Sequence, residues 1–125
     1  MPEEGDSVPR KNFKNYTINK TVLDNGIEVE PVPLTAGETV RINYSGFLAQ
    51  NGAQDVFLHA GYGPADDYWR DVREIPMQRT EQGWETSLPV HDASRLHFCF
   101  HDGANKWDNN SGANWHLEIH NGAIT

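Results

Sequence analysis

RLHFCFH, residues 95–101, alternates apolar and polar side chains along most of its length. A period of two is typical of a β-strand that buries one face and presents the other to solvent. The buried face would carry Leu96, Phe98 and Phe100. The outer face would carry His97, Cys99 and His101.

The same alternation recurs in five further segments, with turn-forming pairs such as Asn25-Gly26 and Asn51-Gly52 between them. The segments are ETVRINY (38–44), QDVFLHA (54–60), VREIPMQ (72–78), GWETSLP (83–89) and NWHLEIH (114–120). We find no segment of ten or more residues with helical spacing. Seven or eight short strands predict an all-β fold, an immunoglobulin-like antiparallel β-sandwich. Its core aromatic residues would be Trp84, Phe98, Phe100 and Trp115.

The 125 residues suffice for one domain with its own core. Residues 1–15 are polar and contain prolines, so we predict a flexible N-terminal tail followed by a single domain over residues 16–125. Residues 16–37 could be strands of the sandwich or an added flap. The single cysteine excludes an internal disulfide and a cysteine-rich zinc module.

The charge balance excludes two classes of partner. Ten Lys and Arg stand against 18 Asp and Glu, a net charge of −8. Nucleic acid and anionic membrane surfaces both require basic patches, so neither is expected as a partner. No apolar run approaches the roughly 20 residues of a membrane helix. The start of the chain contains no apolar segment of a signal peptide, and this favours an intracellular location.

Two long loops carry large aromatic side chains. They lie within LHAGYGPADDYW (58–69) and HDGANKWDNNSGANW (101–115). Trp107 stands among polar and small residues, and an exposed indole usually has a binding partner. A sugar ring offers an apolar face for stacking and hydroxyls that amide and imidazole groups can bond. The loops therefore favour carbohydrate binding, with inclined aromatic planes expected for a helical glucan and parallel planes for a straight chain such as cellulose.

Residues 38–121 resemble carbohydrate-binding module family 25, the starch-binding modules, and the related family 53. The resemblance is carried by H-A-G-Y at 59–62 and by F-x-D-G-x-x-x-W-D-N-N-x-G-x-N-W at 100–115. It implies an immunoglobulin-like β-sandwich that binds α-1,4-glucans (starch, glycogen or maltodextrin) without catalysis or a cofactor. The partner would be an α-glucan polysaccharide or maltooligosaccharide. The family also implies attachment to a larger, secreted multi-module protein, so the compartment stays open.

The resemblance also assigns roles to individual residues. It makes His59 the binding histidine, and it makes Trp69 and Trp107 the stacking tryptophans. Asn109 and Asn110 would be the polar partners beside the second platform. Tyr68 is the alternative to Trp69, because the length of the loop after His59 allows two alignments. The predicted carbohydrate-binding residues are therefore His59, Tyr68, Trp69, Trp107, Asn109 and Asn110.

A metal site is the strongest alternative. If the last two strands pair, their outer faces would bring four histidines, one cysteine and one glutamate within about 5 Å of cross-strand neighbours. The spacing matches no structural zinc motif, so a solvated strand face is the simpler interpretation and no metal ligand is predicted. The residues of this face are His97, Cys99, His101, His116, Glu118 and His120.

Two other functions use the same loops. Glycoside hydrolysis needs two carboxylates about 5–10 Å apart in a cleft, and a small sandwich offers little depth to exclude water. No Ser/His/Asp or Cys/His motif is present, so we predict that the chain is not an enzyme. A protein-interaction surface could instead use the loop aromatics, and soluble glucan would compete only with sugar binding. The carboxylates are Asp66, Asp67, Asp102 and Asp108, and the aromatics are Tyr62, Tyr68, Trp69 and Trp107.

Overall fold

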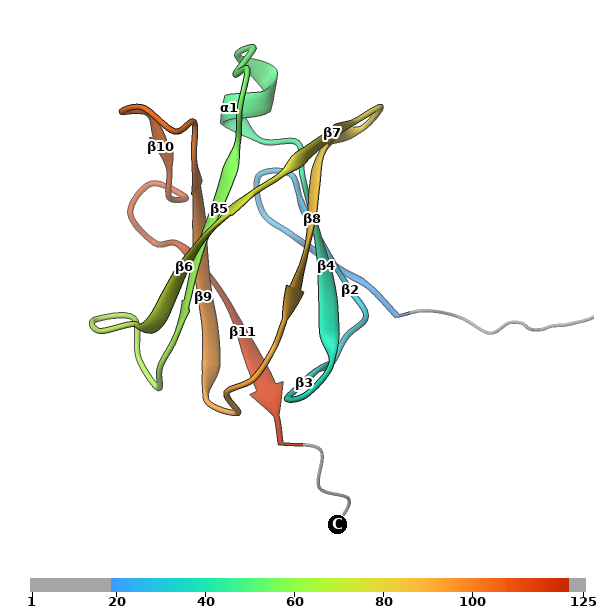
Figure 1. Cartoon of the computed structure of the whole chain (residues 1–125), viewed down its shortest axis with the longest axis vertical. Coiled ribbons are helices and arrows are strands. Elements are labelled where there is room, and N and C mark those ends of the chain that lie inside the picture. Colours follow the sequence, from blue (N-terminus) through green and yellow to red (C-terminus); the bar gives the residue numbers. More distant parts are fainter. Residues whose placement is uncertain (1–18, 122–125) are drawn as a thin grey trace, which may run out of the picture.

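Alternating apolar residues place the chain in two β-sheets that pack face to face (Figure 1). The structure is a computed structural model that describes residues 19–121, and the predicted tail, residues 1–15, lies outside them. The first sheet has the order β1-β2-β4-β8-β7, and the second has the order β3-β11-β9-β5-β6, with β10 also paired to β9. The predicted all-β, immunoglobulin-like sandwich is confirmed, although the pairing of β11 with β3 is parallel.

The described residues contain eleven strands and one short helix, which is too short to cross a membrane. The elements are β1 (Thr21–Leu23), β2 (Ile27–Glu30), β3 (Leu34–Thr35), β4 (Thr39–Tyr44), α1 (Phe47–Gln50), β5 (Phe57–Tyr62), β6 (Arg70–Pro76), β7 (Gln78–Thr80), β8 (Gly83–Pro89), β9 (Arg95–His101), β10 (Trp107–Asp108) and β11 (Trp115–His120).

Two parts of the chain depart from the simplest interpretation of the pattern. The segment 72–78 is not one strand, because β6 ends at Pro76 in the second sheet and β7 begins at Gln78 in the first. Between them Met77 is buried in the core, so the chain crosses from one sheet to the other at that residue. Of residues 16–37, the structure describes 19–37, and these form β1, β2 and β3, which are strands of the sandwich rather than an added flap.

The four predicted core aromatics are all buried, as expected. Trp115 stacks on Phe98, with ring centroids 6.1 Å apart. Its indole Nε1–H donates to the carbonyl oxygen of Asp24 over 2.9 Å, which satisfies the polar end of a buried ring. The buried set is Trp84, Phe98, Phe100 and Trp115.

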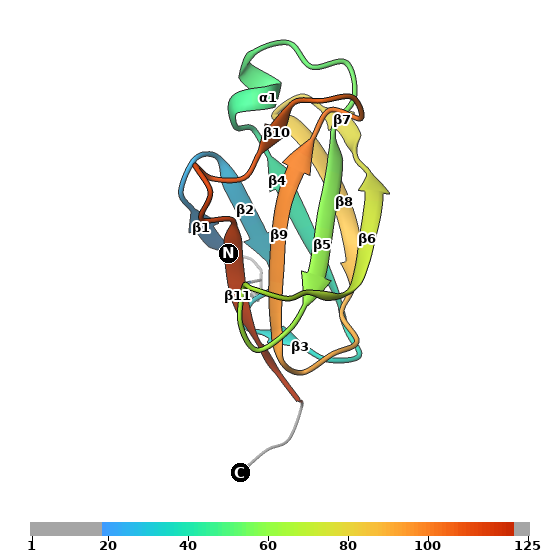
Figure 2. The same ribbon diagram turned by 90° about the vertical axis from the view of Figure 1, so that its left-hand side faces the viewer.

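The outer face of β9 is covered, which corrects the prediction of a solvated strand face. His97 is 1% exposed and Cys99 is 5% exposed, although both point away from the core formed by their neighbours. β9 lies between β5 on one side and both β10 and β11 on the other (Figure 2). Loop side chains, Trp69 among them, lie over this face. Strand alternation identifies the face of a residue, but it does not reveal what a distant loop places on top of it.

β10 and β11 together follow one edge of β9, with an interruption between them. Asp108 pairs with Phe100, and Trp115 pairs with Phe98. Residues 109–114, here called the 109–114 loop, leave the ladder between these pairs. Their backbone is left-handed at Asn110, Ser111, Gly112 and Asn114. Asparagine and glycine tolerate this conformation better than most residues.

Candidate functional site

Aromatic and imidazole rings form a continuous row on the outer face of the second sheet. Trp107 lies 4.4 Å from His101 and 5.1 Å from His59, measured between ring centroids. His59 lies 5.6 Å from Trp69, which in turn stacks on His97 at 5.5 Å. The structure therefore brings three predicted site residues together. This ring row consists of Phe57, His101, Trp107, His59, Trp69, His97 and His116.

The two indole planes of the row are not parallel. The His59 ring makes an angle of 38° with Trp69 and an angle of 86° with Trp107. Two parallel planes would make the same angle with any third plane, so the two indoles are inclined to one another. Both indoles contact His59, with centroid distances of 5.6 Å for Trp69 and 5.1 Å for Trp107. Only the His59 ring therefore lies between the two indole rings, which are the two candidate stacking platforms.

Trp69 occupies space that a glycine leaves free. Gly61 pairs with His97 across β5 and β9. A Cβ atom at Gly61 would lie 2.9 Å from Cβ of Trp69 and 3.1 Å from its Cε3. The indole Nε1–H donates to Oδ1 of Asp66 over 2.8 Å. Trp69 thus lies over Gly61 and against His97, and Asp66 fixes its orientation.

Trp107 combines an exposed side chain with an anchored backbone. It is 48% exposed, and it pairs with His101 in the short β10–β9 ladder. The next residue, Asp108, accepts a 2.6 Å hydrogen bond from the hydroxyl of the buried Tyr44. Burial, and after it this hydrogen bond, raise the pKa of Tyr44 above its usual range. The neutral phenol therefore remains a donor that ties β10 to the core.

Glu74 orients two imidazole rings of the row. Its carboxylate accepts a hydrogen bond from Nδ1 of His59 and another, of 2.6 Å, from Nε2 of His101. Burial raises the pKa of Glu74, but the two imidazole hydrogen bonds outweigh this effect and the net pKa is lowered. With its proton held on Nδ1, His59 retains Nε2 as a hydrogen-bond acceptor.

The remaining predicted residues lie beside the row rather than in it. Tyr68 is 73% exposed and precedes Trp69 in the loop. Asn110 donates from Nδ2 to the Asn114 carbonyl over 3.0 Å and accepts at Oδ1 from Asn25 over 2.7 Å. Oδ1 of Asn109 accepts the Gly112 N–H, and within residues 19–121 its Nδ2 group makes no hydrogen bond. Both amides therefore shape the 109–114 loop. Among the described residues, the Nδ2 group of Asn109 keeps both of its N–H donors for a ligand, and that of Asn110 keeps one.

Several residues of the site were not anticipated. Asp66 accepts from Nδ2 of Asn114, with contacts of 3.2 and 3.3 Å, and so joins the 63–69 loop to the 109–114 loop. Glu74 pairs with His59 across β6 and β5. Strand alternation places Glu74 on the same face of its strand as Arg70 and Val72. It does not indicate which strand pairs with this one. Asp66 was considered only as a carboxylate for hydrolysis, and nothing in the sequence indicated that it joins two loops.

Three of the four loop carboxylates considered for hydrolysis accept hydrogen bonds that hold the loops. Oδ1 of Asp102 accepts the backbone N–H groups of Ala104 and Lys106, and the Ala104 bond is the main cause of a lowered Asp102 pKa. A glycosidase acid needs a raised pKa. Asp108 is bonded to Tyr44, and Asp66 to Trp69. These contacts give Asp66, Asp102 and Asp108 a structural role.

The six-residue face considered as an alternative metal site divides in the structure. Glu118 lies 3.9 Å from Arg95, and His120 pairs with Thr35 at the far end of β11. His120 is four residues from His116, about 13 Å along a strand. Two smaller groups have ligand atoms within 4.8 Å of one another. They are His59, Glu74 and His101, and Asp66, His97 and His116.

Cys99 provides a chemical probe of this face, because it pairs with His59 beneath the row. Burial, followed by the carboxylates of Glu74, Asp108 and Asp66, raises the pKa of its thiol to about 12. At pH 8 the thiol is therefore neutral as well as covered. We expect a thiol-specific disulfide reagent to label Cys99 only after denaturation in urea. Rapid labelling of the native protein would mean that the loops do not cover β9 in solution.

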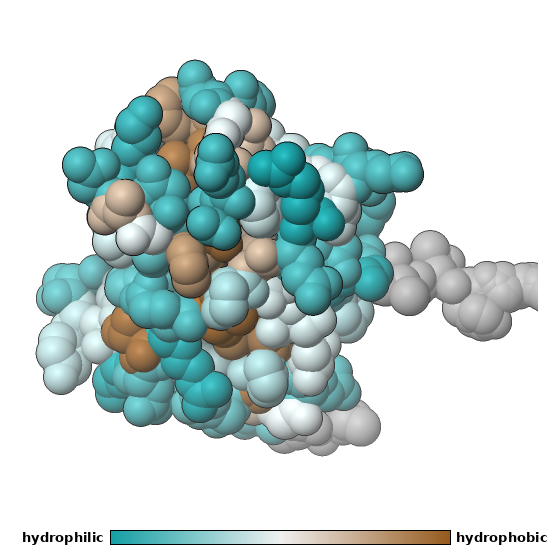
Figure 3. Space-filling model, turned by 45° about the horizontal axis from the view of Figure 1, so that its top comes forward, coloured by the Kyte–Doolittle hydropathy of each residue, from teal (hydrophilic) through white to brown (hydrophobic). Residues whose placement is uncertain are grey.

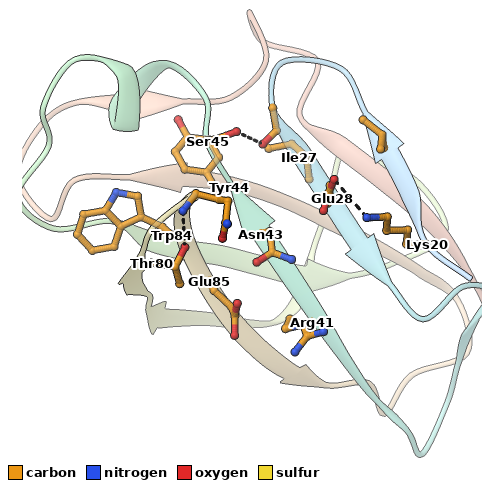
Figure 4. Close-up of a pocket in the computed structure, with 13 residues that line it drawn as sticks. Lys20, Ile27, Glu28, Arg41, Asn43, Tyr44, Ser45, Thr80, Trp84 and Glu85 are labelled. Atoms are coloured by element: carbon orange, nitrogen blue, oxygen red, sulfur yellow. Dashed lines mark hydrogen bonds and ion pairs between the residues drawn. The ribbon is translucent and has the colours of Figure 1, made fainter. Parts of the chain in front are cut away.

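A separate hollow of about 640 Å³ lies on the other sheet, over β1, β2, β4 and β8 (Figure 4). Three of the four charged side chains that line it are paired, Lys20 with Glu28 at 3.7 Å and Arg41 with Glu30. Trp84 lies at its rim, but this ring is buried in the core. The residues that line the hollow thus offer no exposed aromatic plane. None of the predicted carbohydrate-binding residues lines it.

Exposed hydrophobic residues are scattered. From the end of the sandwich that carries α1, they form small areas among hydrophilic ones (Figure 3). A protein interface is usually marked by a larger continuous apolar patch. The large exposed hydrophobic residues among those described are Val22, Phe47, Tyr68, Val72 and Trp107.

Comparison with known proteins identifies proteins that are similar to this chain in part of their sequence. Residues 40–98 match the family described as a starch/carbohydrate-binding module (family 53), a range that includes His59 and Trp69. An α-amylase of Clostridium acetobutylicum is 32% identical over 107 residues, which are 83% of this chain and 14% of that protein. A solved structure of iodinated CBM25 from a Bacillus halodurans amylase aligns with a TM-score of 0.43 and 21% identity, covering 58% of this chain and 79% of that one.

Proposed function

Because residues 40–98 match the starch/carbohydrate-binding module of family 53 and the chain is 32% identical to part of an α-amylase, we propose that it is a module of this kind and binds α-1,4-glucans without cleaving them. Trp69 and Trp107 stack on glucose rings of one chain. His59, which lies in contact with both indoles, accepts a hydrogen bond from a hydroxyl between them. Tyr68 and the free amide donors of Asn109 contact the sugar at the edge of the site.

The inclination of the two indoles is the observation that carries this proposal. Planes that make such different angles with the His59 ring, 38° and 86°, cannot both lie flat on a straight, ribbon-like polymer. A helical α-glucan turns from one glucose to the next, so successive rings present faces at an angle. With a single imidazole between them, the two platforms can engage neighbouring or next-neighbouring sugars. The geometry therefore favours α-glucan over cellulose.

The hydrogen-bond pattern supports the role of His59. Glu74 holds the Nδ1 proton, so Nε2 presents a lone pair to a sugar hydroxyl. Stacking and a few solvent-exposed hydrogen bonds give modest affinity, about 10 µM to 1 mM, or roughly −4 to −7 kcal/mol. Such a site becomes effective when a tether or a second module raises the local concentration. We therefore propose that the chain acts as an accessory module of a larger, glucan-directed protein.

Affinity electrophoresis tests the proposal. The protein is run in native gels that contain soluble starch, glycogen, a soluble cellulose derivative or no polymer. We expect retardation by the two α-glucans and not by the cellulose derivative, with maltooligosaccharides in the gel reversing it. Equal retardation by cellulose, or none by starch and glycogen, would contradict the proposal.

Gly61→Ala is expected to weaken glucan binding by displacing Trp69. The added Cβ would lie 2.9 Å from Trp69 and 3.1 Å from Val72, and such overpacking forces side chains to shift. We expect about a tenfold loss of affinity, equivalent to roughly 1.4 kcal/mol, measured by calorimetry with maltooligosaccharide. Val72→Ala alone is the control and should bind normally. Unchanged affinity in Gly61→Ala would show that Trp69 is not held in place by this contact.

A further inference from the structure

Two imidazoles beneath Trp69 face one another in an unusual way. Nδ1 of His97 lies 2.7 Å from Nδ1 of His116. Nε2 of His97 lies 2.9 Å from the carbonyl oxygen of Gly63, and Nε2 of His116 lies 2.7 Å from that of Ala113. A carbonyl oxygen only accepts hydrogen bonds. Both Nε2 atoms must therefore carry their protons.

This assignment leaves a lone pair on each Nδ1 atom. A neutral imidazole has one N–H and one bare nitrogen, so two neutral rings would hold two lone pairs against each other at hydrogen-bond distance. A cation between them removes the conflict. Asp66 supplies the balancing charge, because Oδ1 lies 3.9 Å from Nδ1 of His97 and Oδ2 lies 3.9 Å from Nε2 of His116.

In the other group, His59, Glu74 and His101, the hydrogen-bonding groups that face one another are already paired. Glu74 accepts the Nδ1 proton of His59 and the Nε2 proton of His101, while His101 Nδ1 accepts the N–H of Gly103 over 3.0 Å. Every donor there meets an acceptor. A metal ion would have to displace two protons that already hold hydrogen bonds. The Asp66 group differs because its bare nitrogens converge.

We propose that Asp66, His97 and His116 form a binding site for a divalent transition-metal ion of the zinc type. The two Nδ1 atoms and the Asp66 carboxylate are the protein ligands, and water completes the shell. Imidazole nitrogen and carboxylate oxygen are ordinary zinc ligands. The Nε2–H bonds to backbone carbonyls are the outer contacts that fix a metal-binding histidine in the correct tautomer.

Only a small adjustment is needed to admit the ion. Two nitrogens on one tetrahedral zinc ion, each about 2.1 Å from it, lie about 3.4 Å apart. The present separation is 2.7 Å. His116 is partly exposed, at 26% of its side chain, and can move outward by this amount. The ion would then link the 63–69 loop, which supplies Asp66, to β9 and β11.

Isothermal titration of untagged, EDTA-treated protein with Zn²⁺ tests the site without any glucan. We expect one ion per chain and a higher thermal midpoint in the presence of Zn²⁺. His116→Gln and Asp66→Asn should each weaken binding by at least the roughly 10- to 100-fold that loss of an outer hydrogen-bond partner of a metal ligand costs. His120→Gln removes an exposed histidine from the same strand, and it should leave Zn²⁺ binding unchanged.

His101→Gln separates the two groups of ligands, because it alters only the Glu74 cluster. Retained binding in His101→Gln together with loss in His116→Gln supports the proposal. Loss in His101→Gln with retention in His116→Gln would overturn it in favour of the other cluster. Failure of the wild-type protein to bind Zn²⁺ would also overturn it, and would mean that a shared proton joins His97 to His116. None of these outcomes depends on whether the protein binds glucan.

Discussion

Trp107→Ala is expected to lower affinity for maltooligosaccharides roughly 70-fold, while the protein remains folded. A sugar ring that covers about 100 Å² of the indole gains about 2.5 kcal/mol at 25 cal/mol per Å², and this is lost with the ring. Trp107 is about half exposed, and its backbone is anchored through β10 and Asp108. Isothermal titration with maltooligosaccharide and gel retardation by starch measure the effect.

Two control variants make this result specific. Trp107→Tyr keeps an aromatic plane and should retain part of the affinity. Val22→Ala truncates an exposed apolar residue of the other sheet and should bind normally. In all three variants the thermal midpoint should stay within about 4 °C of the wild type, which is roughly 1 kcal/mol for a domain of this size. A larger fall in Trp107→Ala would identify Trp107 as a core residue.

Trp115→Ala should have the opposite effect, although it lies only eight residues further along the chain. Trp115 is buried against Phe98 and Phe100, and its indole N–H is bonded to the Asp24 carbonyl. Truncating a buried tryptophan costs about 3–5 kcal/mol, a large part of the roughly 5–15 kcal/mol that holds a domain folded. Urea unfolding, followed by fluorescence, measures the change in the free energy of unfolding.

Trp115→Phe is the matched control for this variant. It keeps an aromatic ring in the core and loses the indole N–H, so its stability should fall between those of the wild type and Trp115→Ala. Trp115→Ala protein that remains folded at low temperature should still bind glucan, because its side chain is not part of the ring row. A loss below about 0.5 kcal/mol, the size expected for a surface residue, would contradict its place in the core.

Strand positions could be predicted because core burial imposes a period of two. β8 and β9 coincide with the segments expected from alternation. The division of residues 72–78 between two sheets could not be predicted, because Ile75 and Met77 keep the alternation on both sides of the crossing. β1, β2 and β3 were left open for a similar reason, since short strands separated by prolines show too few repeats of the pattern.

For the site, sequence patterns identified residues but not their neighbours. His59, Trp69 and Trp107 were expected from the resemblance, and the structure brings them into contact. Their role in glucan binding stays a prediction. Glu74 and Asp66 were missed because their significance lies in contacts between segments 15 to 48 residues apart. The burial of His97 and Cys99 was missed because the loop that covers them comes from elsewhere in the chain.

The interruption between β10 and β11 leaves a loop that does not set the strand register. Strand register is specified on either side of the break, at Asp108 and Trp115, so residues 109–114 lie outside the hydrogen-bonded ladder. A loop of this kind tolerates insertion cheaply, since doubling its length costs only about 0.6 kcal/mol. Changes in the length or composition of this loop would therefore leave the strand register intact, and their structural cost would lie in the loop's hydrogen bonds to Asn25 and Asp66.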